Sequence, residues 1–148
     1  MLSVIDYGAV ADGKTLARAA FQAAVDACHA AGGGTVYVPA GEFVIGTILM
    51  RSHVHIYMES GATLIGSTDF ANDYLPHEEF EGTPYQDISH TYFDHSLFVA
   101  KNCCDIGFSG YGKIDMQGVW RKEMIEMKGF KTYQIGRASC RERVWLRV

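Results

Sequence analysis

The sequence predicts an all-β fold in which short strands wind repeatedly into one coil, with a single α-helix closing its open end. Three observations predict it. Short apolar runs follow one another from residue 35 onward, with glycine-containing turns between them. These runs are too closely spaced for crossover helices, and two-residue Asn-Gly hairpin turns are absent. One alanine-rich helical segment precedes the strands, where a coil needs a cap over its core and its strand edges.

The segment Thr15–Ala31 carries the helical pattern. Apolar residues cover most of its surface, and the polar residues recur at helical spacing along one narrow stripe. The stripe consists of Arg18, Gln22, Asp26 and His29. Thr15 is the expected N-cap. Three consecutive glycines, residues 32–34, end the helix because glycine adopts positive φ without strain.

A period of two replaces the helical period after Gly34. A short strand pattern also lies before the helix, within residues 2–14. In the segment 53–58, Val54 and its alternate neighbours face one side, while His53 and His55 face the other. The predicted strands are 35–38, 43–45, 48–50, 53–58, 62–66, 96–100, 105–109 and 112–115.

Residues 67–95 interrupt the strand rhythm with a segment rich in acids and aromatics. The sequence predicts a long loop insertion on one side of the coil, and long loops in compact domains are often functional. Aromatic faces with polar tips suit sugar stacking and hydrogen bonding. The candidate substrate-binding residues are Tyr85, His90, Tyr92 and His95. The alternative is a loop that packs its aromatics on the coil.

Several segments together resemble the polygalacturonase-type enzymes of glycoside hydrolase family 28, in the pectate-lyase-like β-helix superfamily. They are 6–13, 32–41, 61–64 and 110–118, with Trp120. The resemblance spans residues 3–125 and implies a right-handed parallel β-helix with an N-terminal capping α-helix, of which residues 1–134 form the first coils. Met116 stands where the family more often has glycine.

The resemblance implies hydrolysis of α-linked galacturonan by an inverting two-carboxylate mechanism. In that family the catalytic groups come from Asn-Thr-Asp, Asp-Asp, Gly-His-Gly and Arg-x-Lys segments. None of these occurs in the sequence. We therefore assign no catalytic residue and expect a truncated hydrolase, itself inactive, whose partner is a pectin-type polysaccharide or oligosaccharide.

Two alternatives stay open, because the opening segment is shared with other β-helix proteins. One is a polysaccharide lyase or epimerase of the same superfamily, which would use Ca²⁺-linked acids and Arg or Lys bases. The other is a non-catalytic, glycan-binding β-helix.

The last residues, 135–148, differ from the rest in composition. They hold four arginines, whereas the formal net charge of the whole chain is −4. We expect a non-native tail; a native basic segment that binds a partner is the alternative.

Composition excludes other classes of function. The acidic balance argues against nucleic-acid binding, and no apolar run is long enough for a membrane span. The start of the chain lacks a signal-peptide pattern, which predicts a cytoplasmic protein, or a secreted one if the N-terminus is incomplete. The cysteines (Cys28, Cys103, Cys104, Cys140) form no Cys-x-x-Cys pair, so neither zinc nor a disulfide framework is expected.

No metal and no cofactor is predicted. His53 and His55 could bind a metal from one strand face, but we expect plain exposed strand residues. Asp115 and Asn102 are expected to serve local turns. Cys28 is expected in the core.

Overall fold

The computed structural model describes residues 1–69, 71–75 and 96–117. These residues form three sheets in which every strand pair is parallel: β1-β3-β6-β9 (sheet A), β10-β7-β4-β2 (sheet B) and β5-β8 (sheet C). The strands are β1 (Leu2–Ser3), β2 (Asp12–Leu16), β3 (Gly34–Val38), β4 (Gly41–Ile45), β5 (Ile48–Leu49), β6 (Val54–Met58), β7 (Ala62–Gly66), β8 (Phe98–Val99), β9 (Gly107–Gly110) and β10 (Lys113–Asp115). The helices are the 3₁₀ helix η1 (Val4–Tyr7) and α1 (Arg18–Ala30).

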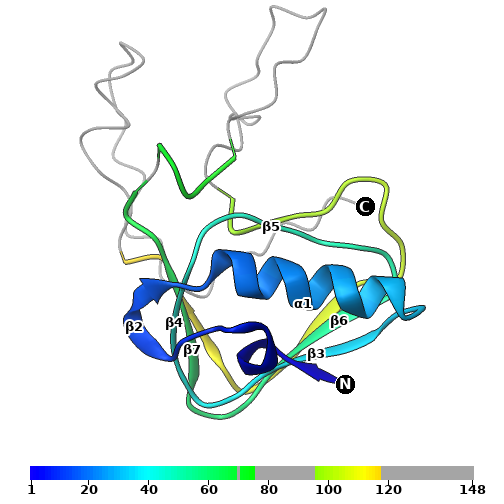
Figure 1. Cartoon of the computed structure of the whole chain (residues 1–148), viewed down its shortest axis with the longest axis horizontal. Helices are drawn as coiled ribbons and strands as arrows, with labels where there is room; N and C mark the ends of the chain where they lie inside the picture. Colours follow the sequence, from blue (N-terminus) through cyan, green and yellow to red (C-terminus); the bar gives the residue numbers. More distant parts are fainter. Residues whose placement is uncertain (70, 76–95, 118–148) are drawn as a thin grey trace, which may run out of the picture.

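The chain visits the three sheets in turn, so the fold is a right-handed parallel β-helix, as predicted. Gly34 pairs with Val54 in sheet A, Gly41 with Ala62 in sheet B, and Ile48 with Phe98 in sheet C. Figure 1 shows these sheets as the sides of the coil, with α1 lying across its opening. The insertion leaves between β7 and β8, at the corner between sheets B and C.

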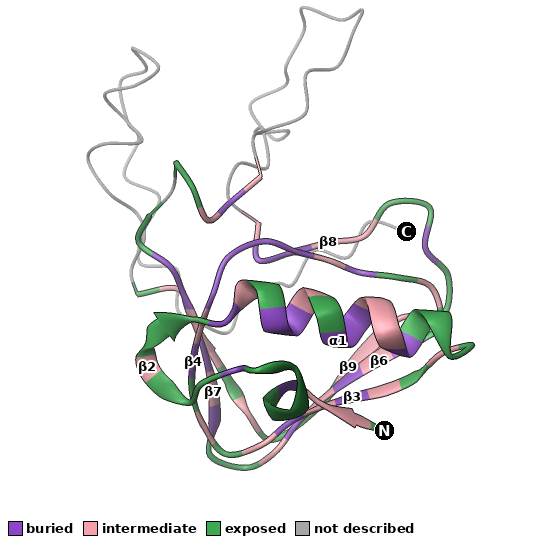
Figure 2. Ribbon diagram, in the orientation of Figure 1, coloured by how far each residue is buried: buried purple, intermediate pink, exposed green. Residues whose placement is uncertain are grey.

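The core lies inside the coil, beneath α1. Along each long central strand, buried residues alternate with half-buried or exposed ones, so one face of sheets A and B points inward. The helix buries one side against them, as the purple segments of α1 in Figure 2 show. The ring of Phe21 meets Phe43 edge to face, with the ring centroids 5.7 Å apart. Cys28 lies in this core, as predicted, and burial raises the pKa of its thiol.

Thr15 is not the N-cap of the helix, which is a correction to the sequence-based expectation. The helix begins at Arg18, and its N-cap Ala17 makes no side-chain cap. Thr15 belongs to β2, where its hydroxyl donates to Asp12 Oδ2 at 2.7 Å. The Asp12 turn and the bond from Ala17 N to Val44 O at 2.7 Å hold this segment on sheet B, so helical geometry starts later.

The segment before the helix contains more elements than the sequence predicts. The pattern of residues 2–14 predicts a single strand, whereas the chain forms β1, η1 and β2 there. The Ser3 side chain accepts from Ile5 N and starts the 3₁₀ turn. Gly8 ends that turn in the left-handed region with φ 92°.

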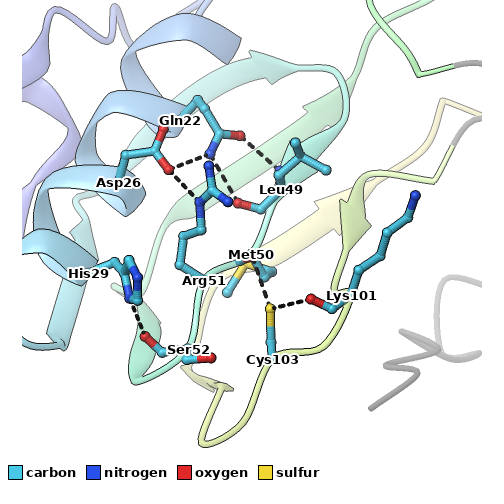
Figure 3. A network of polar contacts seen from close by, with 9 residues as sticks. All are labelled: Gln22, Asp26, His29, Leu49, Met50, Arg51, Ser52, Lys101 and Cys103. Carbon is cyan, nitrogen blue, oxygen red and sulfur yellow. Dashed lines mark hydrogen bonds and ion pairs between the residues drawn. The ribbon is translucent and has the colours of Figure 1, made fainter.

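The polar stripe of α1 lies along the edge of β5 (Figure 3). The Gln22 amide donates to Leu49 O at 3.0 Å and accepts from Leu49 N at 2.8 Å. Asp26 pairs with Arg51 at 2.7 Å, and this bond raises the pKa of the guanidinium. His29 Nδ1 donates to Ser52 O at 2.9 Å. Helix side chains therefore occupy the place at which a preceding strand of sheet C would pair.

The described part of the chain contains no helix with the length and hydropathy of a membrane span. Its three cysteines, Cys28, Cys103 and Cys104, are all free thiols.

Candidate functional site

A groove of about 440 Å³ opens beside the start of sheet A. The loop after α1 forms one wall, and the turns that enter β6 and β9 form the other. The ionisable side chains in its lining are two imidazoles and one carboxylate, those of His53, His55 and Asp105. The remaining lining comes from residues 32–34, Thr35 and Ile106.

His53 and Asp105 form a pair across two neighbouring turns of the coil. His53 Nδ1 lies 3.2 Å from Asp105 Oδ2, and both residues have left-handed backbone, with φ 63° and 56°. His, Asp and Asn tolerate that region better than most residues. A Cβ atom on Gly33 would lie 2.6 Å from His53 O, so glycine lets the loop after α1 rest on this turn. The strand therefore begins at Val54, one residue later than predicted.

His55 is fixed separately. Its Nε2 lies 2.7 Å from Ser109 Oγ, and its ring lies over the backbone of Gly107, where an added Cβ would be 2.7 Å from Nδ1. Gly107 is the sheet partner of His55, which explains this close approach. Among the residues that the structure describes, no group of three His, Cys, Asp or Glu side chains could hold a metal ion.

The groove can hydrogen-bond a polar ligand and transfer protons, because it combines imidazoles with a carboxylate. It does not fit two-carboxylate glycoside hydrolysis. That reaction needs a pair of carboxyl groups about 6.5–9.5 Å apart for inversion, and Asp105 is the one acid in the groove lining.

A second polar cluster lies at the corner where the insertion leaves the coil. Thr47 is buried at its centre, with 1% of its surface exposed. Its hydroxyl donates to Ser96 O at 2.8 Å and accepts from Leu75 N at 3.1 Å, while its own N–H donates to Asp73 O at 3.0 Å. Thr47 therefore ties both ends of the insertion to one point of the coil.

Neighbouring side chains complete this corner. The Tyr74 hydroxyl donates to Ser67 O at 2.8 Å, and burial raises the pKa of Tyr74 to about 12. The Ser67 hydroxyl donates to Asp73 Oδ2. The Asn72 side chain donates to Asp69 and lowers the pKa of that carboxyl. Both carboxylates thus accept hydrogen bonds from their own loop.

The four predicted substrate-binding residues lie outside the described residues: Tyr85, His90, Tyr92 and His95. The predicted tail, 135–148, lies outside them as well. Asp115 bonds Lys113 Nζ at 2.9 Å and Gln117 N at 2.9 Å, and the lysine contact is the larger cause of its lowered pKa. Asn102 has φ 51° in a turn. Both residues therefore serve local turns, in agreement with the prediction.

Sequence reasoning missed Thr47 and the pairing of His53 with Asp105. The second could have been found from the coil repeat. Aligning the strands 54–58 and 107–110 in parallel places residue 53 beside residue 105. Nothing comparable marks Thr47, because its partners come from a segment without periodic pattern.

A family model described as "Rhamnogalacturonase A/epimerase, pectate lyase-like" matches residues 1–137. A mannuronan C5-epimerase of Azotobacter vinelandii is 46% identical over 76 residues, which are 45% of this chain and 5% of that protein. The plasmin and fibronectin-binding protein A of Streptococcus pneumoniae (strain ATCC BAA-255 / R6) is 35% identical over 129 residues, covering 86% of this chain and 17% of that protein.

Among solved structures, the family 28 exopolygalacturonase of Yersinia enterocolitica superposes with a TM-score of 0.66 and 33% identity. The match covers 79% of this chain and 21% of that one. The chain therefore spans only a small part of the length of each of these three relatives.

Proposed function

Because the chain belongs to the rhamnogalacturonase A/epimerase, pectate lyase-like family, we propose that the whole protein is a glycoside hydrolase of pectin-type glycans, resembling polygalacturonases. The observation that carries this proposal is the likeness to the Yersinia exopolygalacturonase, which extends over 79% of the chain at 33% identity. The reaction is inverting hydrolysis of an α-glycosidic bond, with one carboxylic acid protonating the leaving oxygen and one carboxylate activating water.

In this proposal the described residues supply the cap and the platform, and neither of the two catalytic carboxylates is assigned to this sequence. The groove at His53 supports this division, since Asp105 is its one acid. Tyr85, His90, Tyr92 and His95 are the proposed sugar contacts. Their segment begins and ends at the corner that Thr47 holds, so its base has a fixed position on the coil.

A C5-epimerase or lyase is the second candidate. The Azotobacter epimerase shares a higher identity, 46%, over a shorter stretch than the Yersinia enzyme does. Epimerisation and β-elimination both start by removing the proton at C5 of a uronic acid. Hydrolysis leaves that proton in place, which separates the candidates by experiment.

The test incubates the whole protein with polygalacturonate and, separately, with polymannuronate in deuterated water. Hydrolysis predicts new reducing ends from polygalacturonate, inverted anomeric configuration in the first product, and no deuterium at C5. An unsaturated uronate product or deuterium at C5 would contradict hydrolysis and support the second candidate. Binding of a polysaccharide without formation of any product would contradict both candidates and indicate a glycan-binding protein.

The proposed sugar contacts have a matched control. Replacing both His90 and Tyr92 by alanine should raise KM severalfold, because each aromatic contact contributes about 0.5–1.5 kcal/mol. Tyr111→Ala, at a tyrosine that is 83% exposed on the turn between β9 and β10, should leave KM unchanged. Equal KM values for the double variant and the unmodified protein would remove the two residues from the site.

A further inference from the structure

We propose that Cys104, His53 and Asp105 form a reactive-thiol site that takes low-molecular-weight disulfides and other soft electrophiles. This site is independent of glycan processing. Cys104 Sγ lies 4.0 Å from His53 Nε2, and His53 Nδ1 lies 3.2 Å from Asp105 Oδ2. A nucleophile, a base and a group that orients the base therefore follow one another in a line.

The backbone holds the three residues in register. The turn between β5 and β6 stacks on the turn between β8 and β9: His53 N donates to Cys104 O at 3.0 Å, and Cys104 N donates to Ser52 Oγ at 3.2 Å. His53 O in turn accepts from Gly34 N at 2.8 Å. The arrangement thus rests on neighbouring coils of the β-helix.

The hydrogen bonds select the productive tautomer of the imidazole. A carboxylate only accepts, so His53 Nδ1 carries the proton that it donates to Asp105. Nε2 then presents its lone pair toward Cys104 and can take the thiol proton. Cys104 is exposed, and the side chains of His53 and Asp105 are 53% and 82% exposed, so a small reagent can reach the sulfur.

The reaction with a disulfide balances without any further reagent. His53 takes the proton from Cys104, and the thiolate attacks one sulfur of the disulfide. A new S–S bond forms, the old one breaks, and the leaving thiolate recovers the proton from His53. The products are a mixed disulfide on Cys104 and one free small thiol.

Cys103 provides an internal reference next to the reactive residue. It is 8% exposed, and its thiol donates to Met50 O at 3.2 Å and to Lys101 O at 3.2 Å. It has no imidazole contact among the interactions of the described residues. Beyond the three residues of the site, the ionisable groups nearby are His55, which lines the same groove, and His29, which bonds Ser52 O; Arg51, next to Ser52 in sequence, pairs with Asp26.

The experiment measures the alkylation rate of Cys104 by iodoacetamide in the full chain, with peptide fragmentation to separate it from Cys103. We expect Cys104 to react at least about tenfold faster than Cys103 at neutral pH. His53→Asn should lower the Cys104 rate about tenfold at neutral pH, which is less than a fully engaged general base contributes. At strongly alkaline pH, where hydroxide removes the proton, the two proteins should converge.

Asparagine tolerates left-handed backbone, so His53→Asn and Asp105→Asn both preserve the turns. Asp105→Asn should slow the reaction less than His53→Asn does, because it affects only the orientation of the base. Oxidised glutathione should form a mixed disulfide on Cys104 with the same order of rates. Equal Cys104 rates in all three proteins at neutral pH would overturn the proposal, since exposure alone would then explain the reactivity.

Discussion

At the scale of single residues, hydrogen bonds from side chains to the backbone decide the shape of the corners. Thr47 and Asp12 satisfy backbone groups at corners, and Gln22 satisfies those of Leu49 on the side of β5 that no strand pairs with. A coil built from short strands has many corners, and the backbone groups there need other partners. These side chains therefore stabilise the fold at backbone groups that the sheets leave without a partner.

Thr47→Val should destabilise the fold by about 2–3 kcal/mol. Valine keeps the shape of threonine but leaves Leu75 N and Ser96 O without their partner in a partly buried place, and each unsatisfied group costs about 1–3 kcal/mol. Urea unfolding followed by circular dichroism measures the change. Thr47→Ser keeps the hydroxyl and should lose less than half as much. Similar losses in both variants would mean that packing of the methyl group dominates.

The Asp12 carboxyl should titrate near 2. The Thr15 hydroxyl, followed by the backbone N–H groups of Thr15 and Lys14, lowers its pKa from 3.8 to about 2. The folded-state pKa is the lower one, so the resulting stability is present above about pH 4 and is lost as the pH falls through 2. Thr15→Val removes the largest cause and should raise the pKa toward 3.8 in an NMR titration. Thr15→Ser is the control, and an unchanged value in the valine variant would contradict this reading.

At the scale of elements, α1 acts both as a lid on the core and as a partner for the edge of β5. Its apolar side packs into the open end of the coil, and its polar stripe bonds the backbone of Leu49 and Ser52. Exposed strand edges invite pairing with other chains, so α1 removes one such edge at β5.

Two residues of this stripe should differ in their contribution. Gln22→Ala leaves both backbone groups of Leu49 without their side-chain partner and should cost about 1–3 kcal/mol. Asp26→Ala removes an ion pair whose side chains are 44–46% exposed, and such pairs contribute about 0.2–1 kcal/mol. Urea unfolding compares the two variants, and hydrogen exchange at Leu49 N should become faster in Gln22→Ala but not in Asp26→Ala. A larger loss of unfolding free energy in Asp26→Ala than in Gln22→Ala would contradict the role of Gln22 as a hydrogen-bonding partner of β5.

The hydrophobic periodicity of the sequence predicts the strands, but it does not predict the start of the helix or the contact between His53 and Asp105, which depend on hydrogen bonds. The alternation in 54–58 and the apolar run in 62–66 appear as β6 and β7, because an inward face must be apolar in every coil. Thr15 is not the N-cap because its hydroxyl bonds the Asp12 carboxylate instead of the first turn of the helix. The contact of His53 with Asp105 joins residues far apart in sequence, and its recognition requires the register of the coils.

At the scale of the whole molecule, each coil contacts mainly its neighbours, so stability is transmitted along the axis. The cap contacts the first coils directly: α1 packs on η1 and β3 and approaches β4, β5 and β6. Coils further along depend on the cap only through the strands between.

Phe21→Ala should therefore loosen the coil unevenly. Phe21 is fully buried and packs on Phe43, and removing such a ring costs about 3–5 kcal/mol. Hydrogen exchange followed by mass spectrometry should accelerate most in β3 and β4 and least in β9 and β10. Phe21→Leu, which refills most of the space, is the control. Uniform acceleration along the axis would show that the coils unfold as one cooperative unit.

The helix that takes the place of a strand in the first coil limits where sheet C can accept another strand. Sheet C starts at β5, and the side of β5 that faces α1 offers its backbone to Gln22, so another strand has no vacant bonds to join there. A strand added on this side of β5 would have to displace Gln22 from Leu49, whereas the other side of β5 already pairs with β8.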